Sequence, residues 1–306
     1  MKAFIVETKQ LSKKFNQDYA VSNVNLKVEE GDIYGFLGPN GAGKTTTIRM
    51  LLGLTKPSQG EVHLFGKSTK GNHLHALRQI GSLVESPSYY PHLTGYENLE
   101  ALRKILQVPS RRIHEVLEIV QLTKYADRKV KAYSLGMKQR LGIAASLLGE
   151  PKLLILDEPT NGLDPSGIHE IRDLIKSLPK EFGITVLISS HLLHEIDQVA
   201  NKVGIISKGK LIFQDSIEVL RAKAQSQIRI KTADLQRAKK DLWQIGIISE
   251  IKQGTIVFGV ISEAEIANAI RILVEKGHDI YRVEEVRRSL EEIFLDVTAQ
   301  GGLNHA

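Results

Sequence analysis

Several features are missing from this sequence of 306 residues, and each absence excludes a class of protein. It contains no cysteine, so disulfides, zinc–thiolate sites and thiol catalysis are excluded together. No apolar run approaches the roughly 18 residues that a membrane-spanning helix needs. The apolar stretch 3–6 is too short for the core of a signal peptide. We therefore expect a globular protein of the cytoplasm that does not cross a membrane by itself.

The charges form no block that would mark a nucleic-acid-binding tail. The net charge is +6, with 41 Lys and Arg against 35 Asp and Glu, and both signs are scattered along the chain. This pattern is typical of a solvated surface. It also suits a protein that handles a polyanion such as ATP or approaches acidic lipid headgroups.

The first 215 residues alternate strand-like apolar runs with helical patterns. The runs 153–156 and 184–188 are continuously apolar, which is typical of parallel strands buried on both faces. Another run, 32–37, leads into a glycine-rich turn. Together these runs predict an α/β domain with a crossover-built parallel sheet, over residues 1–219.

A helical subdomain is predicted at about residues 86–150. Thr94 and Glu97 have the spacing of a capping box, and Ser110 is placed to cap a second helix. A third helix is expected to start at Ser134 and to stop near Gly149. Its Met and Leu residues at helical spacing indicate core packing.

Residues 220–306 are predicted to form a separate α+β accessory domain. Strands are expected at 228–231, 247–251, 255–260 and 280–286, and helices at 233–243, 263–276 and 290–297. The β-α-β-β-α-β order of the first six elements is the ferredoxin-like pattern. The region carries no chemical motif, so regulation or dimer contact is the expected role.

The segment 38–45 matches G-x-x-x-x-G-K-[ST] between a predicted strand and a predicted helix. Its glycines allow backbone N–H groups to face phosphate oxygens, and the start of the helix adds a positive end. Lys44 can reach the outer phosphates, and the Thr45 hydroxyl can coordinate Mg²⁺. The predicted ATP-binding residues of this P-loop are Gly38, Pro39, Asn40, Gly41, Ala42, Gly43, Lys44, Thr45 and Thr46.

Two carboxylates, Asp157 and Glu158, follow the apolar run 153–156. The ends of strands are where doubly wound sheets bind ligands. Downstream of a P-loop, this pattern predicts that Asp157 holds the hydrated Mg²⁺ and that Glu158 orients or deprotonates the attacking water.

The segment 133–140, with the sequence YSLGMKQR, resembles the ABC signature, usually LSGGQ followed by KQR. From Met1 to about Asp215 the chain resembles an ABC transporter nucleotide-binding domain, with the family's motifs in order. The resemblance implies that Ser134 and Gly136 form a second phosphate-binding surface.

Three further residues receive roles from the same resemblance. Phe15 matches the aromatic residue that stacks on adenine, although Tyr19 lies nearby in the sequence. Asp164 ends a segment, 161–164, that resembles the D-loop at the dimer interface. His191 matches the switch histidine that contacts the γ-phosphate. With Lys44 and Glu158, it belongs to the implied catalytic set.

The sequence departs from the family pattern at three positions. Leu135 stands where glycine is usual, and Met137 stands where glutamine is usual. Glu85 occupies the position of a glutamine that senses Mg²⁺ and the attacking water, so it is a further candidate for catalysis and for metal binding. This glutamate variant resembles the ATP-binding subunits of bacitracin-resistance and lantibiotic-immunity transporters.

The resemblance implies an ATPase that uses ATP and Mg²⁺ to power a membrane transporter. It implies a head-to-tail pair of subunits, which needs a second copy of this chain or a paralogue, and we expect a homodimer. The pair would act on a separate permease at the cytoplasmic face of the membrane, with no nucleic-acid partner. A soluble ABC-type ATPase acting on DNA or ribosomes is the main alternative, but the long coiled coil or second cassette of those proteins is missing. A metabolite kinase would leave the Ser134 motif unexplained.

Overall fold

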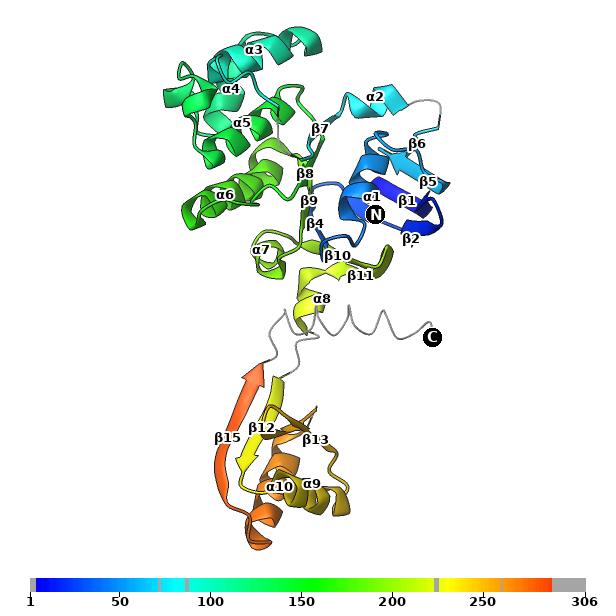
Figure 1. The fold of residues 1–306 in the computed structure, drawn as a ribbon, viewed down its shortest axis with the longest axis vertical. Helices are drawn as coiled ribbons and strands as arrows, with labels where there is room; N and C mark the ends of the chain where they lie inside the picture. Colours follow the sequence, from blue (N-terminus) through cyan, green and yellow to red (C-terminus); the bar gives the residue numbers. More distant parts are fainter. Residues whose placement is uncertain (1–3, 71–72, 86–87, 223–225, 260, 288–306) are drawn as a thin grey trace. The chain divides into compact units, whose positions relative to one another are not determined.

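The computed structural model describes residues 4–70, 73–85, 88–222, 226–259 and 261–287. Residue contacts divide the chain into two compact units, with the division between Ile217 and Glu218 (Figure 1). None of the helices in these ranges is long and apolar enough to cross a membrane. The two units are described separately below.

The first unit is built on a six-stranded sheet in the order β11-β10-β4-β9-β8-β7. Its strands are β4 (Ile33–Leu37), β7 (Ile80–Leu83), β8 (Leu153–Asp157), β9 (Thr185–Ser190), β10 (Lys202–Ser207) and β11 (Lys210–Ser216). All neighbours are parallel except β10 and β11. Every residue of β8 and β9 is buried, as the continuous apolar runs predict.

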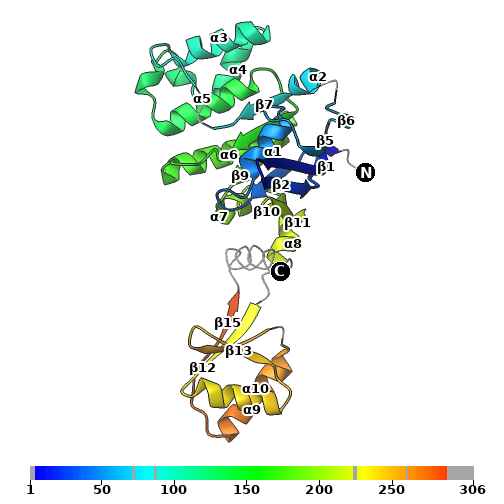
Figure 2. The ribbon, with the colours of Figure 1, turned by 45° about the vertical axis from the view of Figure 1, so that its right-hand side comes forward.

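An antiparallel sheet and a helix complete the core of this unit. The sheet contains β1 (Phe4–Phe15), β2 (Asp18–Val24), β3 (Lys27–Glu29), β5 (Gln59–Leu64) and β6 (Lys67–Ser68). The helix is α1 (Lys44–Leu51). Side chains from both sheets and from α1 share one buried cluster, so the helix that follows the P-loop is fixed between two layers (Figure 2).

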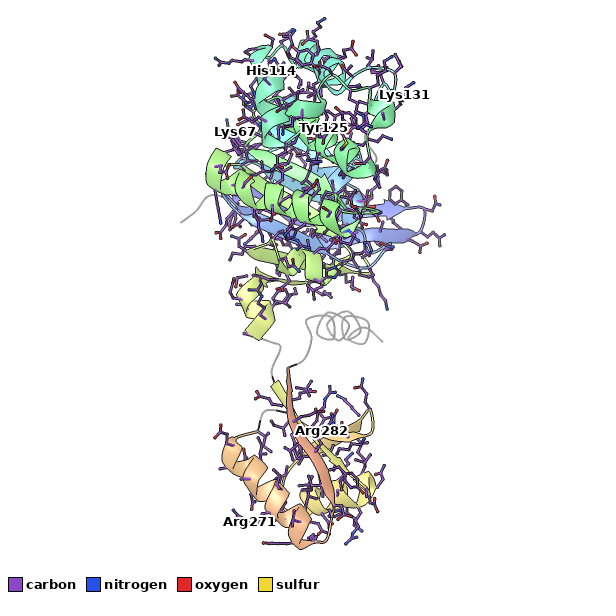
Figure 3. The ribbon with its side chains drawn as sticks, turned by 90° about the vertical axis from the view of Figure 1, so that its left-hand side faces the viewer. Lys67, His114, Tyr125, Lys131, Arg271 and Arg282 are labelled. Carbon is purple, nitrogen blue, oxygen red and sulfur yellow. The ribbon has the colours of Figure 1, made fainter. Side chains whose placement is uncertain are left out.

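The helical subdomain lies beyond β7 at one end of the unit and carries His114, Tyr125 and Lys131 (Figures 1 and 3). It consists of α3 (Gly95–Leu106), α4 (Arg111–Ile119), α5 (Leu135–Leu147) and two short 3₁₀ turns, Thr123–Tyr125 and Val130–Ala132. The capping box between Thr94 and Glu97 is present. The capping role predicted for Ser110 is wrong: this residue precedes α4 in helical backbone geometry, and its side chain makes no capping bond.

The remaining helices of the first unit are α2 (His73–Leu77), α6 (Pro165–Phe182) and α7 (Leu193–Asp197), and α8 (Ile217–Ala222) follows at the division. Ile196 of α7 packs on β4. A Cβ atom added at Gly35 would lie 2.2 Å from the Cγ2 atom of Ile196, so only glycine fits at this crossing.

The second unit has the element order that the sequence predicts as far as residue 287. It contains β12 (Ser226–Thr232), α9 (Leu235–Gln244), β13 (Ser249–Lys252), β14 (Thr255–Phe258), α10 (Glu263–Glu275) and β15 (Ile280–Arg287). Its sheet is antiparallel in the order β13-β14-β12-β15, and the labelled Arg282 lies on β15 (Figure 3). The predicted helix at 290–297 lies outside the described residues. The ferredoxin-like assignment and the boundary at 219/220 stay predictions.

A polar cluster joins the two helices of this unit. Asp241 of α9 accepts from Lys276 at 2.8 Å and lies 2.8 Å from the Nε2 atom of His278, just beyond α10. These contacts hold the pKa of Asp241 below its ordinary value, at about 2, with the His278 hydrogen bond as the largest cause and Lys276 as the next.

Candidate functional site

The P-loop lies between β4 and α1, and two of its glycines have no room for a side chain. A Cβ atom at Gly38 would lie 2.4 Å from the carbonyl oxygen of Ile206, and one at Gly43 would lie 2.5 Å from that of Ala20. Gly43 also has φ of 108°, which glycine adopts without strain. Helix α1 begins directly afterwards at Lys44, so its positive end faces the loop.

Two predicted catalytic side chains, Lys44 and His191, contact the third, Glu158. The Lys44 ammonium lies 3.2 Å from one carboxylate oxygen of Glu158, and the Nδ1 atom of His191 lies 3.0 Å from the other. Lys44 is buried and also donates to the carbonyl oxygen of Gly38 at 2.7 Å. Glu158 has φ of 48°, a strained backbone conformation for a residue with a side chain, and such strain gathers at functional sites.

Asp157 and Thr45 form a second group of interacting side chains in the site. The Thr45 hydroxyl donates to Asp157 at 2.8 Å, and Ser189 at the end of β9 donates to the other carboxylate oxygen of Asp157. A hydroxyl and a carboxylate beside a phosphate loop are the oxygen donors of a Mg²⁺ ion that keeps several waters. In the described ranges no three His, Cys, Asp or Glu residues gather as a metal cage. The Thr45 hydroxyl and the Asp157 carboxylate fit a phosphate-linked Mg²⁺.

Glu85 lies at the same cavity as these residues. The cavity has a volume of about 370 Å³ and is lined by Thr45, Glu85, Tyr89, Leu135, Lys138, Gln139, Asp157, Glu158 and Asn161. The Glu85 side chain is 62% exposed and forms an ion pair with Arg49 of α1. The structure thus brings the predicted Mg²⁺-sensing residue to the site, with an arginine as its contact.

Ser134 and Asp164 are placed at the starts of two helices. The Ser134 hydroxyl accepts from the Met137 amide at 3.2 Å and caps α5. Asp164 accepts from the Gly167 amide at 3.0 Å and caps α6. A Cβ atom added at Gly136 would meet nothing nearer than 4.0 Å, so packing within this chain does not require glycine there.

Phe15 lies at the end of β1 with half of its surface exposed. The Lys13 ammonium lies 5.0 Å from its ring centroid. Tyr19 is similarly exposed on the paired strand β2. Both rings are accessible for stacking on a base. The other predicted phosphate-binding residues, Pro39, Asn40, Gly41, Ala42 and Thr46, lie in the loop or the first turn of α1.

Sequence reasoning missed three residues of the site. Ser189 bonds Asp157 and also accepts from the Glu158 amide at 3.0 Å. Thr160 and Glu195 form a buried hydrogen bond of 2.8 Å next to Glu158 and His191. Polar residues at the end of the apolar run 184–188 were the available signal for Ser189, because the carboxyl ends of neighbouring parallel strands meet at one edge.

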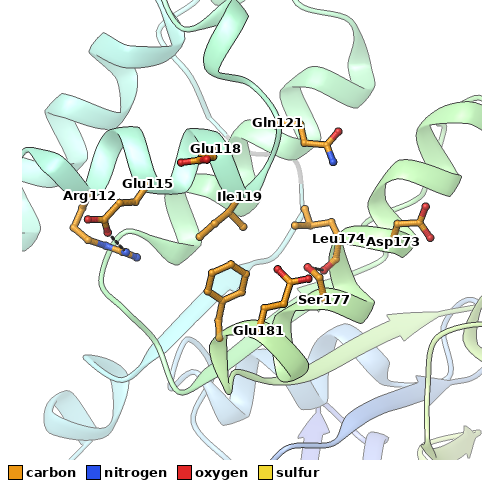
Figure 4. Close-up of a pocket in the computed structure, with 10 residues that line it drawn as sticks. Arg112, Glu115, Glu118, Ile119, Gln121, Asp173, Leu174, Ser177 and Glu181 are labelled. Carbon is orange, nitrogen blue, oxygen red and sulfur yellow. Dashed lines mark hydrogen bonds and ion pairs between the residues drawn. The ribbon is translucent and has the colours of Figure 1, made fainter.

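A second cavity, of about 680 Å³, lies between α4 and α6 (Figure 4). It contains apolar side chains such as Ile119 and Leu174 together with several carboxylates, and Arg112 pairs with Glu115 at its edge. None of the predicted site residues lines it. Thr45, Glu85, Asp157 and Glu158 line the P-loop cavity instead.

A phosphate loop opposite an Asp-Glu pair at a strand end defines a nucleotide-hydrolysing P-loop protein. Comparison with known proteins makes the class specific. The family model described as ABC transporter matches residues 21–161. The chain is 44% identical over 300 residues to the bacitracin transport ATP-binding protein BcrA of Bacillus licheniformis, covering 97% of this chain and 98% of that protein. It is 42% identical over 210 residues to the lantibiotic transport ATP-binding protein SrtF of Streptococcus pyogenes, covering 69% and 90%.

The solved structures give the same result. A dimeric ATP-binding cassette in a post-hydrolysis state, bound to ADP and phosphate, matches with a TM-score of 0.62 and 27% identity, covering 69% of this chain and 98% of that one. This chain belongs to the ABC transporter ATP-binding proteins. It binds ATP and is an ATPase coupled to transport. The predicted likeness to bacitracin and lantibiotic transport subunits is confirmed.

Proposed function

We propose that this chain powers the export of a peptide antibiotic of the bacitracin or lantibiotic type. The observation that carries the proposal is the 44% identity to a bacitracin transport protein over 97% of this chain, which includes the second unit as well as the cassette. Glu85 in the glutamine position supports the same assignment.

Within the site, the ATP phosphates bind the backbone of the P-loop and the ammonium of Lys44. Thr45 and Asp157 would hold Mg²⁺ in the cavity that Glu85 also lines, and the bound ion would neutralise phosphate charge. Glu158 accepts a proton from, or orients, the attacking water, and His191 contacts the γ-phosphate. The 3.0 Å contact between His191 and Glu158 supports a shared role at the reacting water.

Two copies of the chain are proposed to close head to tail around ATP. Ser134 and Gly136 of one copy face the phosphates on the other, and Asp164 lies at the interface between them. The open space around Gly136 supports this arrangement, because a glycine that its own chain does not require suits close approach by a second molecule. The exposed ring of Phe15 stacks on adenine. The pair works on a separate integral-membrane permease at the cytoplasmic face of the membrane.

The substrate can be tested by measuring whether the chain makes susceptible bacteria resistant. Cells would express the chain together with a candidate partner permease, and growth would be measured against bacitracin and against a lantibiotic. We expect the tolerated concentration of one of the two to rise with the wild-type chain and not with the Lys44→Ala variant. A pair that assembles and hydrolyses ATP but protects against neither compound would overturn the peptide-antibiotic assignment.

A further inference from the structure

Glu195 is a buried carboxylate that the reaction described so far does not use. Its side chain lies on α7, four residues after His191, and the residue is only 6% exposed. Burying an ionised carboxylate is unfavourable unless hydrogen bonds compensate it. The hydrogen bonds that compensate the buried Glu195 carboxylate therefore show which parts of the chain it holds in place.

One oxygen of Glu195 accepts two hydrogen bonds, each 2.8 Å long. The donors are the hydroxyls of Thr160 and Ser190, which are 8% and 2% exposed. Thr160 lies two residues after Glu158, and Ser190 lies directly before His191. The carboxylate thus bonds both segments that carry the 3.0 Å contact between Glu158 and His191.

Further hydrogen bonds connect Ser190 and Thr160 to the backbone around the reacting groups. The Ser190 hydroxyl also accepts from the Leu192 amide at 3.0 Å, which fixes the chain on both sides of His191. The carbonyl oxygen of Ser190 accepts from the Gly38 amide at 3.3 Å, which links the same residue to the P-loop. On the other side, the Asn161 amide donates to the carbonyl oxygen of Glu158 at 3.1 Å, which closes the turn that holds Thr160.

Helix α7, which carries Glu195, packs on the central sheet. Ile196, the neighbour of Glu195, is fully buried and packs against Gly35 of β4. Helix α7 is therefore held on the central sheet, and Glu195 holds the two catalytic segments to α7. We propose that Glu195 is a positioning residue for ATP hydrolysis, which sets the distance between Glu158 and His191 through Thr160 and Ser190. The proposal rests on the catalytic roles assigned to Glu158 and His191.

Steady-state kinetics of the purified full chain test the proposal. Glu195→Ala removes both acceptor contacts, and we expect kcat to fall about 10- to 100-fold, because small misplacements of catalytic groups have effects of this size. The KM for ATP should stay unchanged, since the P-loop remains intact. Glu195→Gln should restore most of kcat, because an amide oxygen can accept both hydroxyl bonds.

A matched control separates positioning from general loss of stability. Thr8 is also buried, and its hydroxyl makes two bonds of 2.8 Å, to Val24 and Leu26, in the antiparallel sheet. Thr8→Val should lower the melting temperature with little change in kcat. If Glu195→Ala lowers only the melting temperature in the same way, Glu195 is merely structural. Should Glu195→Ala fail to fold, Thr160→Val removes one of the two bonds, and an unchanged kcat for that variant would overturn the proposal.

A double variant tests whether the effect passes through His191. In a His191→Ala background, Glu195→Ala should lower kcat by a smaller factor than it does in the wild-type chain, because only the Glu158 segment is left to position. A second, fully additive loss would contradict the proposal. The single variants Glu158→Gln and His191→Ala test the assigned catalytic roles by themselves. If these two variants keep their turnover, the catalytic roles are refuted. If they lose turnover while Glu195→Ala keeps a normal kcat, only the positioning role is refuted.

Discussion

Replacing Glu158 by glutamine keeps the size of the side chain and removes its charge. In the structure this carboxylate lies 3.2 Å from the Lys44 ammonium and 3.0 Å from His191, so the substitution weakens two charge-assisted contacts and removes the proposed base. Loss of a positioned general base lowers turnover by roughly 10²–10⁴-fold. This corresponds to about 2.7–5.4 kcal/mol of transition-state stabilisation, at 1.36 kcal/mol for each factor of ten.

Binding of ATP should survive this change. The amide of Glu158 still donates to Ser189, and Lys44 still donates to Gly38, so the backbone of the site is preserved. Phosphate release would measure turnover, and size-exclusion chromatography should show that ATP holds the variant as a closed dimer. Glu181→Gln, an exposed carboxylate at the end of α6, is the matched control and should hydrolyse ATP normally. Near-normal turnover by Glu158→Gln would mean that the assignment of the base is wrong.

Three further perturbations test other parts of the molecule. Lys44→Ala and Ser134→Arg are each expected to be inactive, and mixing them should restore one intact site; heterodimers that form without recovering ATPase activity would refute the shared site. Glu85→Gln should keep most ATPase activity, whereas Glu85→Ala should impair antibiotic resistance more than Glu85→Gln does; normal resistance in the alanine variant would show that Glu85 is only a solvated loop residue. The pKa of Asp241 is lowered from 3.8 to about 2 by His278 and Lys276, so its contribution to stability is complete above its ordinary pKa and is lost as the pH falls from there through about 2. Fluorescence of the single tryptophan, in the same helix α9, should report this acid unfolding, and Asp241→Asn should be less stable than the wild type at neutral pH, with a smaller further loss on acidification.

Local patterns in the sequence predicted the elements that carry the chemistry. The P-loop spacing, the run that ends in Asp157 and Glu158, and the serine before α5 are all visible without a fold, because strand burial, glycine turns and helix caps depend on a few adjacent residues. The same local rules failed at Ser110. A serine in a capping position still needs an extended backbone to turn its hydroxyl toward the helix, and the chain there is helical.

Only the tertiary structure decided which of these residues touch one another. The contacts of Glu158 with Lys44 and His191 join three segments that are far apart in the chain, and their distances depend on the order β4-β9-β8 in the sheet. The buried bonds of Glu195 are equally invisible in the sequence, since a glutamate on a short helix reads as a solvated residue until the packing of α7 on β4 buries it. The sequence by itself determined the chemistry of this protein, because the motif residues and their spacing are local. The folded chain determined how those groups are held, because that depends on contacts between distant segments.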